Sequence, residues 1–355
     1  MSSAIKQAPI SCPGHTRPVV DIYFSVETDC GTLFITAAKD CKAILRRGDT
    51  GDWIGTFLGH EGAVWSCVLD AHATKAATGA ADFTAKLWDT VSGHQLLSIT
   101  EEHVVRCTDL SKTDSGAFLA TANNAKKISV YDLIAPTKPL IQLQAHDEFL
   151  RRTLWCDGDR HLLTASEDAT IKLWDLKDRK KNPVIETPCW SRSCSLAVKD
   201  FQFHHPNDEH TGETLAAVAA GAAVHLYLYD WRNTSASPDP IESFNLPCNM
   251  NSVSIHPTDN TLVCGGEDHY IYRVDRTTGE ILETCKGHFG PVHCVRFSPD
   301  GHVFTSGSED GTVRLWQTEP GQKYGLWDLS VPTGNMERSS GCVTGEGSTP
   351  VSCPS

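Results

Sequence analysis

The sequence predicts an all-β protein, a seven-bladed β-propeller closed by an N-terminal outer strand. Aromatic residues recur at a constant interval, since Trp88, Tyr131 and Trp174 lie 43 residues apart and Trp316 ends the series. Short β-branched runs alternate with turn sequences such as Pro299-Asp300-Gly301. No stretch has a sustained helical period. A tandem array of small antiparallel sheets explains all three observations.

Three copies of the repeat are intact, and each runs from a small residue and His to a Trp. They are Gly59-His60 to Trp88-Asp89, Ala145-His146 to Trp174-Asp175, and Gly287-His288 to Trp316-Gln317. In each, an Asp lies 22 residues after the His and six before the Trp, at Asp82, Asp168 and Asp310. A repeat of roughly 40 to 45 residues with these ends is the WD40 signature, which supplies four strands of one blade.

Four further copies align with these positions but have lost part of the signature. Copy one has His15, Thr36 and Asp40 with Arg46 in the Trp position, and copy three has His103, Thr121 and Tyr131 with Ala125 in the Asp position. Copy five has Cys194, Ala217, Gly221 and Tyr227, and copy six has Leu246, Cys264 and Val274 with only Asp268 retained. The number of blades is therefore seven.

One propeller domain is expected over residues 1–329. Its blades are predicted near 14–58, 59–101, 102–144, 145–188, 189–245, 246–286 and 287–329. Residues 7–11 precede the first Gly-His pair as residues 55–58 precede the second, so they should form an outer strand that joins the last blade and closes the ring. Ser, Thr, Gly and Pro make up 16 of the 26 residues from 330 to 355, which predicts a disordered tail.

The composition argues against several classes of function. The chain has 31 Lys and Arg against 44 Asp and Glu, a net charge of −13, which disfavours nonspecific binding to nucleic-acid phosphates. Its 14 cysteines form no C-x-x-C pair, and the first residues lack the apolar stretch of a signal peptide. No apolar run approaches the roughly 20 residues that cross a membrane. We expect a cytosolic protein with reduced thiols and without a cofactor.

The intact copies combine a hydroxyl, a His, an Asp and a Trp, which superficially resembles a hydrolase triad. A catalytic site occurs once, whereas this set recurs with its Trp in blade after blade. We interpret the sets as structural tetrads, and the resemblance to other WD40 repeats implies that Trp donates to the hydroxyl, the hydroxyl to His, and His to Asp. They comprise His60, Thr78, Asp82 and Trp88; His146, Thr164, Asp168 and Trp174; and His288, Ser306, Asp310 and Trp316.

The topology of a blade places the Gly-His loops and the Asp turns at the same end of the strands. That end should carry a candidate partner-binding rim made of Arg17, Lys39, Glu148, Glu167, Glu267, Phe289 and Glu309. Three of the glutamates immediately precede an Asp position and make the predicted rim acidic. A basic or mixed partner segment would then be the natural ligand, and a rim that only aids solubility is the alternative.

Specific stretches outside the repeat signature resemble one family. They are residues 14–21, 47–60, 73–78, 82–86, 287–301 and 323–327, and the run Gly-Asp-Thr-Gly-Asp-Trp at 48–53 is the most specific of them. Together they resemble the serine-threonine kinase receptor-associated protein family over residues 12 to about 327. The resemblance also implies an acidic C-terminal tail. Residues 330–355 depart from this, because Glu337, Arg338 and Glu346 are their only charged residues.

The resemblance implies a non-enzymatic adaptor. Its implied partners are the survival motor neuron complex, which loads Sm proteins onto spliceosomal RNAs, and the Gemin subunits through which the family contacts it. Damping of transforming-growth-factor-β receptor signalling is also implied, with receptor kinases and Smad proteins as partners. RNA would be contacted only indirectly, and the propeller itself would be a monomer without membrane insertion.

Two other functions remain open. The WD40 subunit of translation initiation factor three is a related propeller, although the sequence at 51–54 argues against it. A hydrolase or metal enzyme is the other, because residues 203–213 hold three His and three acidic residues. Their spacing matches no metal-ligand motif, and a solvated hairpin tip explains the same composition.

Overall fold

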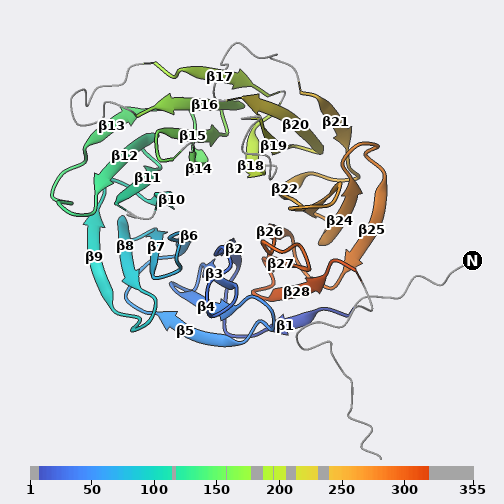
Figure 1. Ribbon diagram of the computed structural model, residues 1–355, viewed down its shortest axis with the longest axis horizontal. Coiled ribbons are helices and arrows are strands. Elements are labelled where there is room, and N and C mark those ends of the chain that lie inside the picture. The colour runs from blue at the N-terminus through green and yellow to red at the C-terminus, as the bar shows by residue number, and fades with distance from the viewer. Residues whose placement is uncertain are drawn as a thin grey trace, which may run out of the picture.

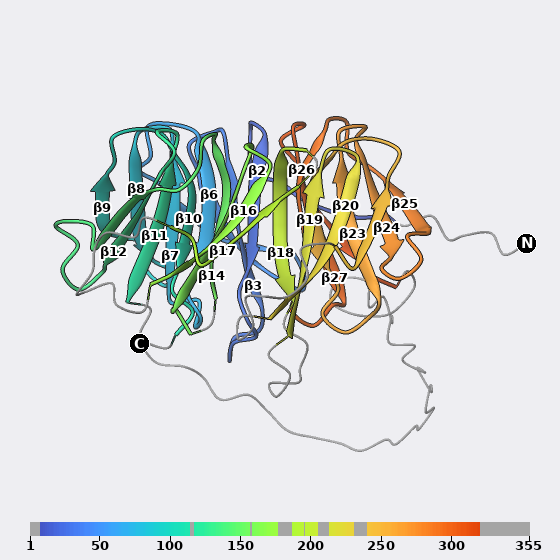
Figure 2. The ribbon, with the colours of Figure 1, turned by 90° about the horizontal axis from the view of Figure 1, so that it is seen from above.

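Seven four-stranded antiparallel sheets are arranged around a central axis (Figure 1). The computed structural model describes residues 8–113, 117–156, 158–176, 187–194, 196–204, 213–230 and 240–319. Every element within these ranges is a β-strand, and the strands run roughly parallel to the axis when the ring is seen from its side (Figure 2). The prediction of an all-β, seven-bladed propeller is confirmed.

The first four blades are formed in chain order. Blade one contains β2 (Val19–Phe24), β3 (Leu33–Ala38), β4 (Ala43–Arg47) and β5 (Trp53–Phe57), and blade two contains β6 (Val64–Leu69), β7 (Lys75–Ala80), β8 (Thr84–Asp89) and β9 (Gln95–Thr100). Blade three contains β10 (Val105–Leu110), β11 (Phe118–Asn123), β12 (Lys127–Asp132) and β13 (Ile141–Gln144), and blade four contains β14 (Leu150–Cys156), β15 (His161–Ser166), β16 (Thr170–Asp175) and β17 (Trp190–Ser193).

The last three blades repeat the pattern. Blade five contains β18 (Val198–His204), β19 (Glu213–Ala220), β20 (Ala223–Asp230) and β21 (Glu242–Asn245), and blade six contains β22 (Met250–Ile255), β23 (Thr261–Gly266), β24 (Tyr270–Asp275) and β25 (Ile281–Lys286). Blade seven contains β26 (Val292–Phe297), β27 (Val303–Ser308), β28 (Val313–Gln317) and the N-terminal β1 (Ile10–Cys12).

The N-terminal strand closes the ring. β1 pairs antiparallel with β28, with Ile10 opposite Leu315 and Cys12 opposite Val313. The strand begins at Ile10 rather than at residue 7, so the predicted span of 7–11 is wrong in its bounds. Pro9 and Pro13 flank the strand, and proline lacks the N–H that pairing requires, which confines it to three residues.

The boundary between blades four and five also differs from the prediction. β17 spans Trp190–Ser193 and pairs with β16, with Leu173 opposite Trp190. The outer strand of blade four therefore lies beyond residue 188, inside the range predicted for blade five. Trp190 packs against the core formed with Leu173, which fixes it to this sheet. The alignment of the repeats missed this because the connection between β16 and β17 is longer than the corresponding connection in the other repeats.

Adjacent blades pack through apolar faces. Ile35 and Leu45 of blade one, for example, lie against Val64, Leu69 and Trp88 of blade two, and all five are buried. Fully burying one such side chain stabilises the fold by about 1.5 to 3 kcal/mol. Because each blade covers its neighbours, the ring must close for the first and last blades to be covered.

Each inner strand has a bulge near its first residue. In β10, for example, the pairing with β11 shifts between Val105 and Cys107, so Arg106 is the extra residue. A bulge reorients the extra side chain relative to the flanking strand residues. The extra residues of the seven inner strands are Val20, Trp65, Arg106, Arg151, Lys199, Asn251 and His293. All seven line one cavity on the ring axis.

Candidate functional site

The predicted tetrad of blade two forms a continuous hydrogen-bond chain. Trp88 Nε1 donates to Thr78 Oγ1 at 2.8 Å, and Thr78 Oγ1 lies 2.7 Å from His60 Nε2. His60 Nδ1 lies 2.8 Å from Asp82 Oδ2. Because Nδ1–H of the neutral His60 donates to the Asp82 carboxylate, Nε2 is the acceptor and the Thr78 hydroxyl donates to it. The chain joins β7 and β8 to the loop that enters the blade.

Blades four and seven contain the same chain. The distances from Trp to hydroxyl, hydroxyl to His and His to Asp are 3.0, 2.8 and 2.9 Å in blade four, and 2.8, 2.7 and 3.0 Å in blade seven. The hydroxyls of Thr78, Thr164 and Ser306 belong to residues without solvent exposure. A substrate has no access to them, so the tetrads stabilise the blades and do not form an active site.

The tetrads make stability depend on pH. Burial lowers the pKa of His288 to about 4 and also lowers the pKa of His60 and His146. An unfolded His has a pKa near 6.5, so between pH 6.5 and 4 the unfolded chain binds more protons. The free energy of unfolding should therefore decrease as pH falls through this window, by up to about 1.4 kcal/mol per pH unit for each His that stays neutral.

Calorimetry at pH 7.5, 6.5, 5.5 and 4.5 would measure this dependence. We expect the melting temperature to fall progressively below pH 6.5, and His288→Asn to show a lower melting temperature at pH 7.5 with a shallower decline. A melting temperature that is constant from pH 7.5 to 5 would contradict the assignment of neutral, hydroxyl-bonded histidines.

Blade one keeps a His, Thr and Asp but replaces the Trp by a buried arginine. His15 Nε2 lies 2.8 Å from Thr36 Oγ1, and His15 Nδ1 lies 3.0 Å from Asp40 Oδ2. Arg46 is only 1% exposed and donates to the carbonyls of Gly51, at 3.1 Å, and Pro13. Two backbone carbonyls therefore accept the hydrogen bonds of the arginine that stands in the Trp position.

Blade three uses a glutamate in place of the predicted histidine. Glu101 accepts hydrogen bonds from Thr121, Tyr131 and Asn123 at 2.6, 3.0 and 3.2 Å. His103 is exposed instead. The connection between β10 and β11 is two residues longer than that between β6 and β7, so alignment by distance from Tyr131 selects the wrong residue. Glu101 is buried, and its carboxylate satisfies three donors at once.

Among the residues that the structure describes, blades five and six have no complete tetrad. The positions expected to hold one in blade six, Leu246, Cys264 and Val274, lie together in one apolar cluster. Asp268 instead accepts a hydrogen bond from Tyr272. In blade five, the Cys194 sulfur lies 3.7 Å from the Tyr227 hydroxyl, a weak contact. Apolar packing replaces the hydrogen-bond chain in these two blades.

Local opening should be easier where the tetrad is missing. We expect amides within 190–275, such as those of β23, to exchange with solvent faster than amides within 55–90, such as those of β7. Native-state hydrogen exchange followed by mass spectrometry would compare the two regions. Equal protection would show that packing alone stabilises a blade as well as the tetrad does.

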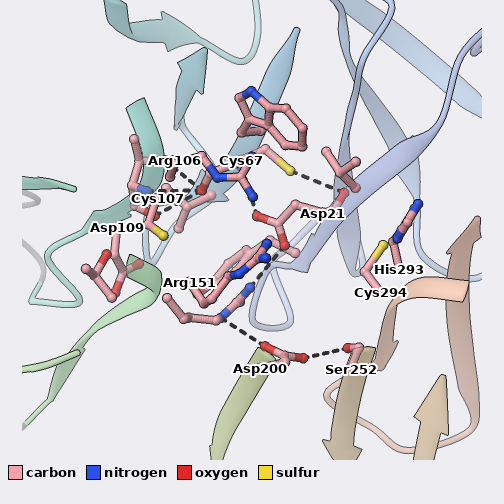
Figure 3. A pocket seen from close by; sticks show the side chains of 18 of the residues that line it. Asp21, Cys67, Arg106, Cys107, Asp109, Arg151, Asp200, Ser252, His293 and Cys294 are labelled. Carbon is pink, nitrogen blue, oxygen red and sulfur yellow. Dashed lines mark hydrogen bonds and ion pairs between the residues drawn. The ribbon is translucent and has the colours of Figure 1, made fainter. Parts of the chain in front are cut away.

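The cavity on the ring axis is the candidate site. It has a volume of about 250 Å³ and is lined by residues of all seven inner strands (Figure 3). Six Lys and Arg residues line it against three Asp, in a chain whose net charge is −13. The bulge residues lie at the end of the inner strands that receives the Gly-His loops, so they form the mouth of the cavity on that face.

Cations from blades one and three meet at a tryptophan of blade two. The Arg106 guanidinium lies 3.8 Å from the Trp65 ring centroid, and Lys39 Nζ lies 5.7 Å from it. Burial, together with the nearby Arg151 guanidinium, lowers the pKa of Arg106 to about 10. Arg106 therefore stays charged at neutral pH, in a group of cations that repel one another.

The structure places the predicted rim residues around this mouth, but several are paired. Glu167 contacts Arg151 and lies 3.9 Å from Lys199, and Glu309 lies 3.2 Å from Lys39 and 2.6 Å from His293. The expectation of a simply acidic rim is therefore wrong for the inner part of this face. It omitted the bulge residues Arg151 and Lys199, whose cations offset Glu167, and it did not foresee that Lys39 pairs with Glu309.

The other rim residues lie farther out. Glu148 Oε1 is 3.6 Å from Lys126, and Glu267 accepts a hydrogen bond from Asn249 at 3.1 Å. Phe289 is 83% exposed, and Arg17 is exposed as well. The face thus has a cationic centre surrounded by glutamates and an exposed aromatic ring.

Below the mouth, a buried ion-pair network crosses the cavity. Asp200 accepts two hydrogen bonds from Arg296, at 2.7 and 2.9 Å, and one from Ser252 at 2.5 Å. Arg152 of blade four reaches Asp21 of blade one at 3.0 Å and approaches Asp200 at 3.7 Å. These side chains form a floor, and Asp21, Asp200 and Ser252 can be followed in Figure 3.

The bulge residues that form the mouth were not among the site residues predicted from the sequence. In six copies, the bulge residue lies five positions after the residue in the His position, as Trp65 does after His60. In blade three the same spacing starts from Glu101 and reaches Arg106. This spacing is visible in the sequence, but its meaning depends on knowing that the strand bulges there.

Within the described ranges, no group of three or more His, Cys, Asp and Glu side chains is arranged to bind a metal ion. Most of the His-containing run at 203–213 and all of the predicted tail at 330–355 lie outside those ranges. The part of the chain that the structure describes also contains no helix suited to crossing a membrane.

Comparison with known proteins supports the repeat and identifies the family. The WD domain, G-beta repeat family model matches residues 51–89, 137–175, 240–273 and 279–317. The human serine-threonine kinase receptor-associated protein is 44% identical over 329 residues, which cover 93% of this chain and 88% of the human protein. This chain belongs to the serine-threonine kinase receptor-associated protein family. The family member of Dictyostelium discoideum is 36% identical, over 87% of this chain and 98% of its own.

The initiation-factor propellers are more distant from this family member. Subunit I of eukaryotic translation initiation factor 3 from Drosophila sechellia is 26% identical over 86% of this chain and 95% of its own. As a WD40 scaffold of the serine-threonine kinase receptor-associated protein family, the chain presents a ring surface on which proteins can dock.

Proposed function

We propose that this protein is a non-enzymatic adaptor that binds the survival motor neuron complex through Gemin subunits and supports the assembly of spliceosomal ribonucleoproteins. A role in damping transforming-growth-factor-β receptor signalling, through receptor kinases and Smad proteins, is the second part of the proposal. The observation that carries it is 44% identity over 93% of the chain to a protein named for association with a receptor kinase. The survival motor neuron part rests on the family resemblance of the sequence.

The adaptor function is supported by a surface that is already formed before a partner binds. The three intact tetrads bury their hydroxyls, and the cavity is lined by charged groups that pair with one another. A preformed surface loses little conformational entropy on binding, which suits a protein that several partners share. We also propose that the protein resides in cytoplasm and nucleus, where both processes would require it, and cell fractionation would test this.

Affinity purification of the tagged full-length chain from its source cell, followed by mass spectrometry, tests the proposal. We expect survival motor neuron and Gemin proteins to be recovered. Recovery of initiation factor 3 subunits in their place would overturn the proposal in favour of the related propeller. Ester hydrolysis or zinc-dependent activity of the purified protein would overturn its non-enzymatic part.

A further inference from the structure

The cavity mouth is open on one face and closed below. Arg152 extends from blade four to Asp21 in blade one, across the cavity, and Arg296 pairs with Asp200 beside it. A polypeptide cannot pass through the ring without separating these buried pairs, whose disruption is costly. A ligand must enter from the Gly-His face and end at the floor, as a loop or a chain terminus does.

The charge of the mouth selects the ligand. Lys39, Arg106, Arg151 and Lys199 face two carboxylates, those of Glu167 and Glu309. The three Asp residues deeper in the cavity pair with Arg152, Arg296 and Lys112. The mouth therefore has about two positive charges in excess, and an anion with two negative charges would neutralise them.

Arg106 is the side chain best placed to donate hydrogen bonds to an anion in the mouth. Its guanidinium stacks on Trp65 at 3.8 Å, an arrangement that orients its N–H groups while leaving them able to bind an anion. In the neighbouring blade, the Nε of Arg151 is buried without a hydrogen-bond partner. Planar guanidinium groups bind phosphate through paired hydrogen bonds, and such charge-assisted bonds are among the strongest in proteins.

We propose that the mouth binds a phosphorylated loop or terminus of a partner protein, with the phosphate between Arg106, Arg151 and Lys199. This inference rests on the proposed adaptor function and names the chemistry of the partner segment. A phosphate monoester carries close to two negative charges at pH 7 and matches the excess charge of the mouth.

The outer part of the same face makes a protein segment the better ligand than a nucleic acid. Glu148 and Glu267 lie on the exposed surface around the mouth, where they would repel a continuous phosphate backbone. Phe149 and Phe289 are 42% and 83% exposed and can pack against apolar side chains. We expect the residues that flank the phosphorylated residue to be basic or apolar.

Binding of peptide pools to the immobilised full-length protein tests the inference. Three pools share their length and their degenerate flanks and differ only in the central residue, which is phosphoserine, serine or glutamate. We expect the phosphoserine pool to be retained at least about tenfold better than the other two, because each charge-assisted bond to phosphate contributes a factor of this order. Retention should fall as salt is raised.

Variants of the mouth and of the opposite face separate this site from general charge effects. Arg106→Gln and Lys199→Gln should each lower retention of the phosphoserine pool about tenfold. Arg106→Lys, which keeps the charge but loses the paired donors, should bind at an intermediate level. The control is Lys138→Gln with Arg276→Gln, because both residues lie in loops at the other end of the strands. Only variants that melt like the unmodified protein are compared.

Equal retention of the phosphoserine and serine pools would overturn the inference, as would full retention by both mouth variants. Equal retention of the glutamate pool would show that the ligand is a carboxylate and would overturn the phosphate assignment. If the pools fail but affinity purification recovers the survival motor neuron complex, the inference falls and the adaptor function stands. If the phosphoserine pool binds but affinity purification does not recover that complex, the phosphate site stands and the proposed adaptor function falls.

Discussion

Replacing Asp200 by Ala should lower the free energy of unfolding by about 3 to 5 kcal/mol, the range found when one member of a buried ion pair is removed. Asp200 is 5% exposed, and it joins Arg296 and Arg152 to the Ser252 hydroxyl and the Val253 N–H. Burial alone would raise the pKa of Asp200, but Arg296 and Arg152 hold it below its usual value. The Ala variant would leave two buried guanidinium groups short of a counter-charge, so the effect should exceed that of a lost contact.

Denaturant unfolding and calorimetry would measure this loss, with Glu61→Ala as a matched control because Glu61 is exposed on the same face. The control should change stability by less than about 0.5 kcal/mol. Arg296→Met should also be destabilising, and the double variant should lose less than the sum of the two. If Asp200→Ala were as stable as the control, the floor of the cavity would not be held by these pairs.

Deletion of residues 1–12 should destabilise the whole propeller. β1 covers the edge of β28, and Ile10 and Cys12 pack in the cluster that joins blades seven and one. Without the strand, Val313 and Leu315 lose their cover, the ring opens, and an unpaired strand edge is exposed to other chains. The lost burial corresponds to roughly 2 to 4 kcal/mol, and we expect a lower melting temperature together with aggregation.

Point variants separate strand closure from the loss of chain length. Cys12 is buried and Ser11 is exposed on the same strand, so Cys12→Asp should reproduce the deletion and Ser11→Asp should not. Melting curves recorded by circular dichroism would compare the three proteins. A truncated chain that melts at the unmodified temperature would show that the ring is held by its other blades.

Much of the fold could be predicted because the tetrads repeat. His60, Thr78, Asp82 and Trp88 have a fixed spacing that only a four-stranded blade explains, and two further copies repeat it. The degenerate blades were harder because other residues fill the same role. Glu101 replaces a histidine from a different position, and Arg46 replaces a tryptophan by binding two carbonyls. No periodic pattern signals these exchanges.

The candidate site was predicted only in outline. The sequence placed the residues before each Asp turn, such as Glu167 and Glu309, at the end of the strands where the mouth of the cavity lies. It did not indicate which side chains enter the cavity, because that depends on a bulge in each inner strand. Two residues adjacent in sequence, Arg151 and Arg152, lie in different layers of the cavity for this reason. Their partners, Glu167 and Asp21, come from different blades.

We infer that partners of this protein bind on the Gly-His face, through the cationic mouth. Quantitative affinity purification from cells would measure this, with the unmodified chain, Arg106→Gln with Lys199→Gln, and Lys138→Gln with Arg276→Gln expressed at equal levels. We predict that the mouth variant loses the partner proteins that the opposite-face variant retains. Equal recovery by both variants, or loss only from the opposite-face variant, would contradict it.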